Sequence, residues 1–466
     1  MNPQRIVIIG GGPGGYVAAI RAAQLGAQVT LIEKDQIGGT CLHRGCIPTK
    51  TLLHDAGILR SLKNSPVFQH FSLDTSDILD PMMERKKKVI QDLVKGVEIL
   101  LESHRVTIKH RQADLFNSNQ VVLFDGEKEV FDADRIILAP GSKSKGLPNI
   151  TPDGERILTS DEALELREIP RELVIIGGGY IGVEFATLFH TLGSRVTIIE
   201  ILENILPGLE GELARSLRRF LERDGVKIFT QSAVEEIQQR EGGLRVTIKT
   251  PQGIEEILPE KLLLAVGRGP NLEMNFPKAG VETSPRGIKV NRYMETTSPH
   301  VYAIGDAIEG MMLAHVAMEQ GRIAAENAMG LQQEWDPPSI PLCIFTHPEV
   351  ASIGLTEKEA KEKGEIKIGR FPFRSNPKAV ISGETDGMIK VIARRENETI
   401  VGVHIIGPEA TVLISVASTM IGCKLKEFAR FIQAHPTLPE ALKEACLDVE
   451  GLAIHLPKPL RPPKSA

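Results

Sequence analysis

The sequence predicts an α/β fold in which one unit, made of a strand, a turn, a helix and a second strand, occurs twice. Residues 10–33 and 177–200 are equal in length and are identical at eleven paired positions. Each segment follows a short apolar run, residues 6–9 or 173–176, of the kind that forms a buried strand. Each then shows the spacing Gly-x-Gly-x-x-Gly and a helical stretch that ends at Leu-Gly. Strands that alternate with helices in this way predict parallel sheets covered by helices.

Length and composition set the class of protein. The chain has 466 residues, enough for about three domains, and its 42% hydrophobic and 25% charged residues are typical of a globular protein. The net charge of −5 argues against a nucleic-acid partner, which would select a basic face. No apolar run approaches the roughly 18 residues of a membrane span, and the first strand begins too early for a signal peptide. We therefore expect a cytoplasmic protein.

The glycine-rich unit has a specific physical logic. Its first glycine permits a tight turn, its second lets the backbone approach a pyrophosphate, and its third lets helix and strand pack closely. The helix N-terminus presents N–H groups to the phosphates, and an acid at the end of the second strand binds the ribose. The residues are Gly10, Gly12, Gly15 and Glu33 in the first unit, and Gly177, Gly179, Gly182 and Glu200 in the second. Two units predict two dinucleotides, and a flavin with a nicotinamide is the common pairing.

Glu200 also bears on the choice of nicotinamide cofactor. A carboxylate at this position suits the free 2′-hydroxyl of NAD and repels the 2′-phosphate of NADP, which arginines would bind. The next residues, Ile201 to Glu203, supply no cation. The second unit therefore favours NAD.

Two of the five cysteines, Cys41 and Cys46, lie close together just after the first unit. A structural disulfide is not expected in a reducing cytoplasm, so the pair indicates redox chemistry or metal ligation. Metal ligation would need two more ligands, and His43 and His54 do not complete a usual zinc pattern. We therefore expect no metal. Two unrelated buried cysteines remain as the other alternative.

Several segments together resemble a known family. They are residues 38–50 (GGTCLHRGCIPTK), both glycine-rich units, residues 302–306 (YAIGD), residues 341–357 and residues 434–440 (AHPTLPE). The sequence resembles the flavin disulfide reductases, or class I pyridine nucleotide-disulfide oxidoreductases, over nearly the whole chain. The resemblance implies two Rossmann-like domains that bind FAD and NAD, followed by a C-terminal α+β dimerisation domain. The implied domains are an FAD-binding domain (1–147), an NAD-binding domain (148–268), a central domain that returns to the FAD domain (269–339) and an interface domain (340–466).

The resemblance also implies a catalytic role for each motif residue. Cys41 would form the mixed disulfide with the substrate, and Cys46 would pass electrons to the flavin. His435 would act as the general acid and base, which suits an imidazole, and Glu440 would orient it. In this family the histidine comes from the partner subunit, which implies an obligate homodimer. Lys50, one helical turn after Cys46, would pair with Glu184 near the flavin ring.

Further cofactor contacts follow from the same resemblance. For FAD they involve Gly39, Thr40, Lys50, Gly141, Asp306, Leu313, Ala314 and His315, and a helix is expected to begin after Leu313. For NAD they involve Tyr180, Ile181 and Gly267.

Within the family, the motifs are most similar to those of the members that oxidise protein-bound dihydrolipoamide with NAD⁺. The implied partner is the lipoyl-bearing E2 or H-protein of a 2-oxoacid dehydrogenase or glycine cleavage complex. Two departures from the family pattern, Gln433 and Pro439, affect the substrate channel but leave the acid/base pair in place. An NAD(P)H-dependent reductase of another low-molecular-weight disulfide is the alternative enzyme, and a metal-thiolate protein without turnover is the alternative outside that class.

Overall fold

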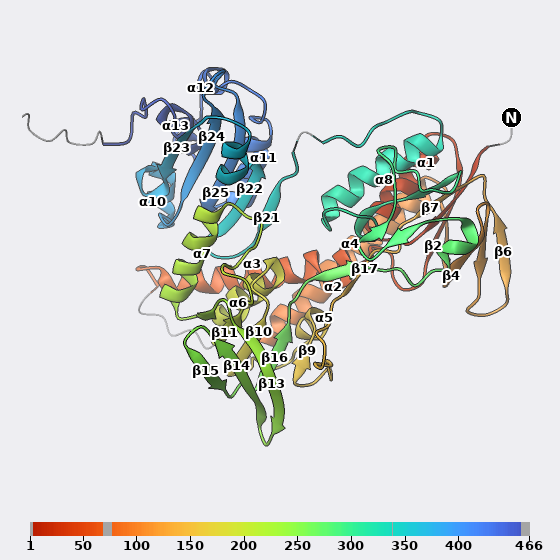
Figure 1. Cartoon of the computed structure of the whole chain (residues 1–466), viewed down its shortest axis with the longest axis horizontal. Coiled ribbons are helices and arrows are strands. Elements are labelled where there is room, and N and C mark those ends of the chain that lie inside the picture. The colour runs from red at the N-terminus through yellow and green to blue at the C-terminus, as the bar shows by residue number, and fades with distance from the viewer. Residues whose placement is uncertain (1–2, 69–76, 338, 458–466) are drawn as a thin grey trace, which may run out of the picture. The chain divides into compact units, whose positions relative to one another are not determined.

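The computed structural model describes residues 3–68, 77–337 and 339–457 of the chain (Figure 1). The chain forms two compact units, each assembled from segments that are distant in the sequence. Unit 1 comprises Met1–Arg171, Arg240–Leu244 and Pro259–Asp336. Unit 2 comprises Glu172–Gln239, Arg245–Leu258 and Pro337–Ala466.

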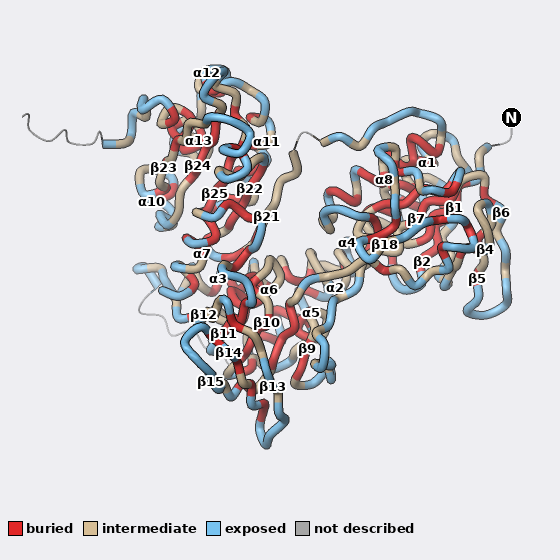
Figure 2. The backbone as a smooth tube through the Cα atoms, in the orientation of Figure 1, coloured by how far each residue is buried: buried red, intermediate tan, exposed pale blue. Residues whose placement is uncertain are grey.

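A five-stranded parallel sheet forms the centre of unit 1, in the order β20-β7-β1-β2-β3. Its strands are β1 (Arg5–Ile9), β2 (Gln28–Glu33), β3 (Thr107–His110), β7 (Arg135–Leu138) and β20 (Val301–Ala303). Apolar residues are buried on both faces of the sheet, as a parallel sheet requires (Figure 2). Because β20 pairs with β7, the chain returns to this sheet after a long excursion.

Two helices, α1 (Pro13–Gln24) and α8 (Ala314–Ala328), lie side by side in unit 1 (Figure 1). A Cβ on Gly321 would lie 2.3 Å from the backbone oxygen of Gly14, so the two helices meet at backbone distance. Arg21 and Glu326 form an ion pair of 2.7 Å between them. The first and last segments of unit 1 are thereby packed together.

Unit 1 contains further helices and strands outside this central sheet. They are α2 (Gly39–Arg44), α3 (Cys46–Asn64), α4 (Leu79–Ser103), β4 (Ala113–Asn117), β5 (Gln120–Leu123), β6 (Glu129–Asp132), β8 (Ser142–Ser144), β9 (Ile157–Leu158), α5 (Ser160–Ala163), β16 (Lys261–Leu264), β17 (Arg268–Pro270), η1 (Phe276–Ala279), β18 (Thr283–Ser284), β19 (Gly287–Ile288) and η2 (Gly305–Ala307). Strands β4, β5 and β6 form an antiparallel sheet of their own.

Unit 2 begins with the second repeat. Strands β10 (Glu172–Ile176), β11 (Arg195–Ile199) and β12 (Lys227–Phe229) pair in parallel, and α6 (Tyr180–Leu192) connects the first two. Helix α7 (Gly211–Asp224) leads into β12, and β13 (Ala233–Arg240), β14 (Gly243–Thr250) and β15 (Gly253–Ile257) form a separate sheet.

The last part of unit 2 is an antiparallel sheet in the order β21-β22-β25-β24-β23, with an apolar core of its own (Figure 2). Its strands are β21 (Leu342–Ile344), β22 (Glu349–Gly354), β23 (Ile366–Pro372), β24 (Met388–Arg394) and β25 (Ile400–Gly407). The helices are α9 (Glu357–Glu362), η3 (Phe373–Ser375), α10 (Pro377–Ser382), α11 (Ala410–Ser418), α12 (Leu425–Ala429) and α13 (Glu440–Asp448).

The predicted α/β fold is confirmed, and both repeats form the expected strand, turn, helix and strand. They pair in the same register, with Ile9 opposite Ile32 in the first and Ile176 opposite Ile199 in the second. The helix expected after Leu313 begins at Ala314. Over the described part of the chain, no helix has both the length and the apolar character that crossing a membrane requires.

The close approach of α1 and α8 predicts the effect of one added methyl group. In Gly321→Ala the new Cβ meets backbone rather than a movable side chain, so we expect a loss of stability of about 1–3 kcal/mol and a lower melting temperature. Gly96→Ala is the matched control, because Gly96 also lies inside a helix but no described atom is within 4 Å of its Cβ position. The control should stabilise by about 0.4–1 kcal/mol. A Gly321→Ala protein that melts no lower than wild type would contradict the packing.

Candidate active site

The first glycine-rich turn has the geometry that a bound pyrophosphate requires. Gly10 has a φ of 106°, and a Cβ on Gly15 would lie 1.8 Å from the Gly10 carbonyl oxygen, so only glycine fits there. At Gly12 no described atom lies within 4 Å of the Cβ position, which leaves room for a ligand. No side chain in the described residues caps the first turn of α1. Its N–H groups therefore remain available to phosphate oxygens.

The carboxylate of Glu33 anchors this turn to the end of β2. Its Oε2 accepts the Gly11 N–H at 2.6 Å and its Oε1 accepts the Asp35 N–H at 2.8 Å. The sequence predicted a contact with ribose at this residue but missed the two backbone bonds. A carboxylate oxygen has more than one lone pair, so these bonds leave acceptor capacity for the ribose hydroxyls.

The second glycine-rich turn repeats these features one by one. Gly177 has a φ of 107°, and a Cβ on Gly182 would lie 1.9 Å from the Gly177 oxygen. The position beside Gly179 is open within the described structure, and α6 begins without a side-chain cap there. Tyr180 and Ile181 form the first turn of α6. The second turn therefore fits a dinucleotide as well as the first.

Glu200 occupies the same place in the second turn as Glu33 does in the first. Its Oε2 accepts the Gly178 N–H at 2.7 Å, and its Oε1 accepts the Leu202 N–H at 2.8 Å. Glu200 is buried. This carboxylate follows the last residue of β11, where it would repel the 2′-phosphate of NADP.

The cysteine segment is fastened to the first glycine-rich turn. The Gly38 N–H donates to the Gly11 oxygen at 2.8 Å, and a Cβ on Gly39 would lie 2.8 Å from the Gly12 Cα. Helix α2 starts at Gly39, so Thr40 and Cys41 follow directly. The structure thus brings the cysteines next to the first dinucleotide site.

The two cysteines of the segment form a dithiol in which the sulfhydryl groups hydrogen-bond to each other. Cys41 lies on α2, and Cys46 is the first residue of α3. The hydrogen bond with Cys46, together with burial, raises the pKa of Cys41 well above its usual range, although the nearby charge of Lys50 acts in the opposite direction. These effects favour the protonated form of Cys41 in the reduced pair.

Asp306 and Gly141 come from different segments of unit 1 and follow β20 and β7, which are neighbouring strands. Asp306 Oδ2 accepts a hydrogen bond from Ser142 Oγ at 2.6 Å, and Ser142 in turn accepts one from Arg268 Nε at 2.8 Å. The Gly141 oxygen accepts the Asn271 N–H. Sequence reasoning did not assign Ser142 or Arg268 a role, because no local spacing links residues so distant along the chain.

His435 and Glu440 form a hydrogen-bonded pair in unit 2. His435 Nδ1 lies 3.0 Å from Glu440 Oε1, and the Thr437 N–H donates to Glu440 Oε2 at 2.8 Å. Burial acts to raise the pKa of Glu440, but these two hydrogen bonds outweigh it and hold the pKa below its usual range. The carboxylate is therefore ionised when it orients the imidazole.

For the remaining expected residues, the predicted contacts stay predictions. Glu184 is buried on α6, and its Oε1 accepts the Phe345 N–H at 3.0 Å, a contact that the sequence did not predict. The ion pair between Glu184 and Lys50 stays a prediction, since the two belong to different units. The same holds for the contacts of Gly267, Leu313, Ala314 and His315 with a cofactor.

Comparisons with known proteins agree with this geometry. Residues 4–321 match the pyridine nucleotide-disulphide oxidoreductase family, and residues 340–446 match the dimerisation domain of that family. A dihydrolipoyl dehydrogenase of Bacillus subtilis is 43% identical over 97% of this chain and 99% of its own length. The mitochondrial dihydrolipoyl dehydrogenase of Pisum sativum is 39% identical over 97% of this chain and 92% of its own.

Similar solved structures cover nearly the whole chain. The crystal structure of LpdA from Mycobacterium tuberculosis has a TM-score of 0.88 and 27% identity, and covers 95% of this chain and 99% of that one. The HOCl-induced flavoprotein disulfide reductase RclA from Escherichia coli has a TM-score of 0.84 with the same identity and the same coverage.

The hydrogen bond between the two thiols can be tested by alkylation of the reduced protein. Cys46→Ala removes the partner that raises the pKa of Cys41, so more of Cys41 becomes thiolate at pH 8. We expect carbamidomethylation of Cys41, followed by peptide mass spectrometry, to be about tenfold faster than in wild type, because the thiolate is the reactive form. Cys423, in unit 2, gives the reference rate of the reagent. An unchanged rate at Cys41 would show that Cys46 does not control it.

Proposed function

The chain belongs to the pyridine nucleotide-disulphide oxidoreductase family, and we propose that it acts as a dihydrolipoyl dehydrogenase on protein-bound dihydrolipoamide. It is an FAD- and NAD-dependent flavoprotein oxidoreductase. Full-length relatives of that function support the proposal. The observation that carries its chemistry is the dithiol fastened by Gly38 and Gly39 to the first glycine-rich turn.

The reaction is a thiol–disulfide exchange that begins with the oxidised form of the cysteine pair. One thiolate of the substrate attacks Sγ of Cys41, a mixed disulfide forms, and Cys46 leaves as a thiolate. The second thiolate of the substrate then attacks the substrate sulfur that is bonded to Cys41. This step closes the lipoamide ring and releases Cys41 as a thiolate. Two electrons have then moved from the substrate to the protein dithiol. FAD, when bound, carries them on to NAD⁺ as hydride.

His435 is the group that we propose moves the protons in these steps. Each attack requires a thiolate, so a base must take the proton of the incoming thiol. The Glu440 carboxylate holds Nδ1 of the imidazole, which leaves Nε2 to exchange the proton. The His435 side chain is 66% exposed in the single chain. We propose that it reaches the cysteines of a partner subunit, which the match to the dimerisation domain supports.

The cofactor residues divide between the two turns. The first turn, with Glu33, Gly39 and Thr40, would hold FAD beside the cysteines, and Lys50 with Glu184 would complete that site. The second turn would hold NAD, and the buried Glu200 carboxylate favours NAD over NADP.

The partners and the compartment are part of the same proposal. A homodimer is supported by the dimerisation-domain match, and the substrate would arrive on the lipoyl-bearing E2 or H-protein of a multienzyme complex. The cytoplasm is the proposed compartment, because a dithiol that cycles suits a reducing environment.

A comparison of substrates tests the function directly. We expect the purified yellow protein to reduce NAD⁺ rapidly with dihydrolipoamide and to reduce oxidised glutathione only slowly with NADPH, as followed at 340 nm. Rapid turnover of glutathione instead would establish the alternative disulfide reductase. A colourless protein that contains zinc and no flavin would establish a metal-thiolate protein.

The role of Glu440 can be tested against a matched control on the same helix. Glu444 lies one turn further along α13 and holds His455 Nδ1 at 3.0 Å through Oε1, as Glu440 holds His435. We expect Glu440→Gln to lower kcat about a hundredfold, the low end of what general acid–base catalysis contributes. Glu444→Gln, which removes the same charge from the other pair, should change kcat by less than about threefold. Equal losses in both variants would assign Glu440 a role in stability only.

A further inference from the structure

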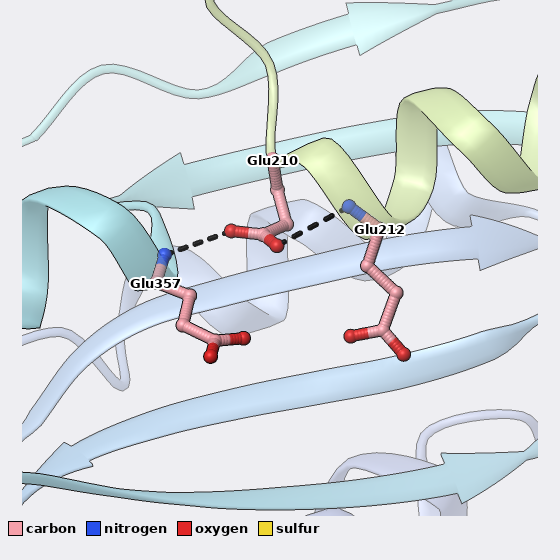
Figure 3. A group of neighbouring side chains, drawn as sticks. All are labelled: Glu210, Glu212 and Glu357. Atoms are coloured by element: carbon pink, nitrogen blue, oxygen red, sulfur yellow. Dashed lines mark hydrogen bonds between the residues drawn. The ribbon is translucent and has the colours of Figure 1, made fainter.

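Three carboxylates gather in unit 2 at a place that the proposed reaction does not use (Figure 3). They belong to Glu210 and Glu212 at the start of α7 and to Glu357 at the start of α9, and their oxygens lie within 4.8 Å of one another. Such a group could hold a metal ion, but Lys390 of β24 already fills it. Lys390 Nζ lies 2.8 Å from Glu210, 2.9 Å from Glu212 and 2.6 Å from Glu357. An ammonium has three N–H donors, and each has a carboxylate.

The cluster is charged although Lys390 and Glu210 are buried. The Lys390 side chain has no exposed surface, and its pKa is raised because the three carboxylates outweigh the effect of burial. Hydrogen bonds from Lys361 and Lys390 lower the pKa of Glu357 to about 2. Arg370 adds hydrogen bonds to Glu212. Because a buried charge that loses its partner is strongly destabilising, this arrangement fixes the positions of its members.

The Glu210 carboxylate also binds the backbone at the start of α7 and of α9. Its Oε2 accepts the Glu357 N–H at 2.8 Å, and its Oε1 accepts the Glu212 N–H at 3.3 Å, as the dashed lines in Figure 3 show. Glu210 is the N-cap of α7. The end of the loop that precedes α7 is therefore attached to the antiparallel sheet of the same unit.

The same loop, residues 201–209, begins at the second glycine-rich turn. It leaves Glu200, whose Oε1 accepts the Leu202 N–H, and it returns to the turn where the Leu206 N–H donates to the Gly178 oxygen at 2.8 Å. The Ile205 side chain also lies against Gly178, since a Cβ there would be 2.8 Å from it. One end of the loop thus supports the turn, and the other end is attached to Lys390.

We propose that Lys390 is a positioning residue for the dinucleotide at the second glycine-rich turn. It holds Glu210, Glu210 fixes the end of loop 201–209, and the loop holds Gly178 and Glu200 in the arrangement that receives the adenosine half of the cofactor. The inference rests on the proposed function to the extent that this turn binds NAD. Loss of the Lys390 charge should therefore weaken cofactor binding without touching the dithiol.

The first experiment compares Lys390→Met with wild type in the flavin-loaded protein. We expect the KM for NAD⁺ and the Kd of ADP-ribose, measured by calorimetry, to rise about tenfold, which corresponds to about 1.4 kcal/mol. The kcat, the KM for dihydrolipoamide and the flavin content should stay within twofold of wild type. Lys367→Met is the control, because Lys367 lies on β23, the strand next to β24, and forms an exposed pair with Glu450. A role in stability alone would lower the melting temperature but leave the KM for NAD⁺ unchanged, and that result overturns the proposal.

The second experiment is charge-matched and applies even if Lys390→Met does not fold. Glu210→Gln and Glu357→Gln each remove one carboxylate from the same ammonium, but only Glu210 ends the loop. The proposal requires Glu210→Gln to raise the Kd of ADP-ribose several times more than Glu357→Gln does, and equal effects would overturn it. Binding of ADP-ribose needs no turnover. A wild type that binds ADP-ribose but does not oxidise dihydrolipoamide therefore rejects the proposed function and leaves the inference open to the same comparison of variants.

Discussion

The close approach of the third glycine to the first in each repeat is the constraint on which the molecule depends. A Cβ would lie 1.8 Å from a carbonyl oxygen at Gly15 and 1.9 Å from one at Gly182, so the strand can pass into the helix only through glycine. This turn aims an uncapped helix N-terminus at the ligand and places the acid at the end of the next strand beneath it. The two dinucleotide sites are therefore consequences of backbone geometry.

The two repeats differ in the segment that follows the second strand of each. After β2 the chain turns back through Gly38 and Gly39 and enters the helices that carry the dithiol. After β11 it runs through residues 201–209 to the N-cap of α7. The segment after β2 thus places the dithiol beside the first glycine-rich turn. The segment after β11 instead supports the second turn and is attached to the antiparallel sheet. Because the two turns are otherwise alike, we attribute the proposed difference between a flavin site and a nicotinamide site to these two segments.

Local pattern was enough to predict the repeats, because strand, turn and helix depend on neighbours within a few residues. The His435 and Glu440 pair came from the resemblance of one short motif to the family, because local pattern alone does not distinguish a catalytic histidine from an ordinary loop histidine. Local pattern could not predict the hydrogen bonds that link Arg268, Ser142 and Asp306, or those from Lys390 to Glu210 and Glu212, since these bonds join residues more than a hundred positions apart. A lysine in a strand is usually solvent-facing. Lys390 is buried only because three acids from other elements meet it.

The proposed exchange explains why the dithiol needs a histidine. The hydrogen bond with Cys46 and burial both raise the pKa of Cys41 and so favour its protonated form. In the proposed exchange the substrate arrives as a thiol but attacks as a thiolate, so each attack requires that a proton be taken from the substrate. A base is thus needed where the substrate meets Cys41. An imidazole fixed through Nδ1 by an ionised carboxylate supplies one transferable proton at Nε2. The dithiol exchanges electrons with the substrate in this proposal, and the His435 and Glu440 pair exchanges the accompanying proton.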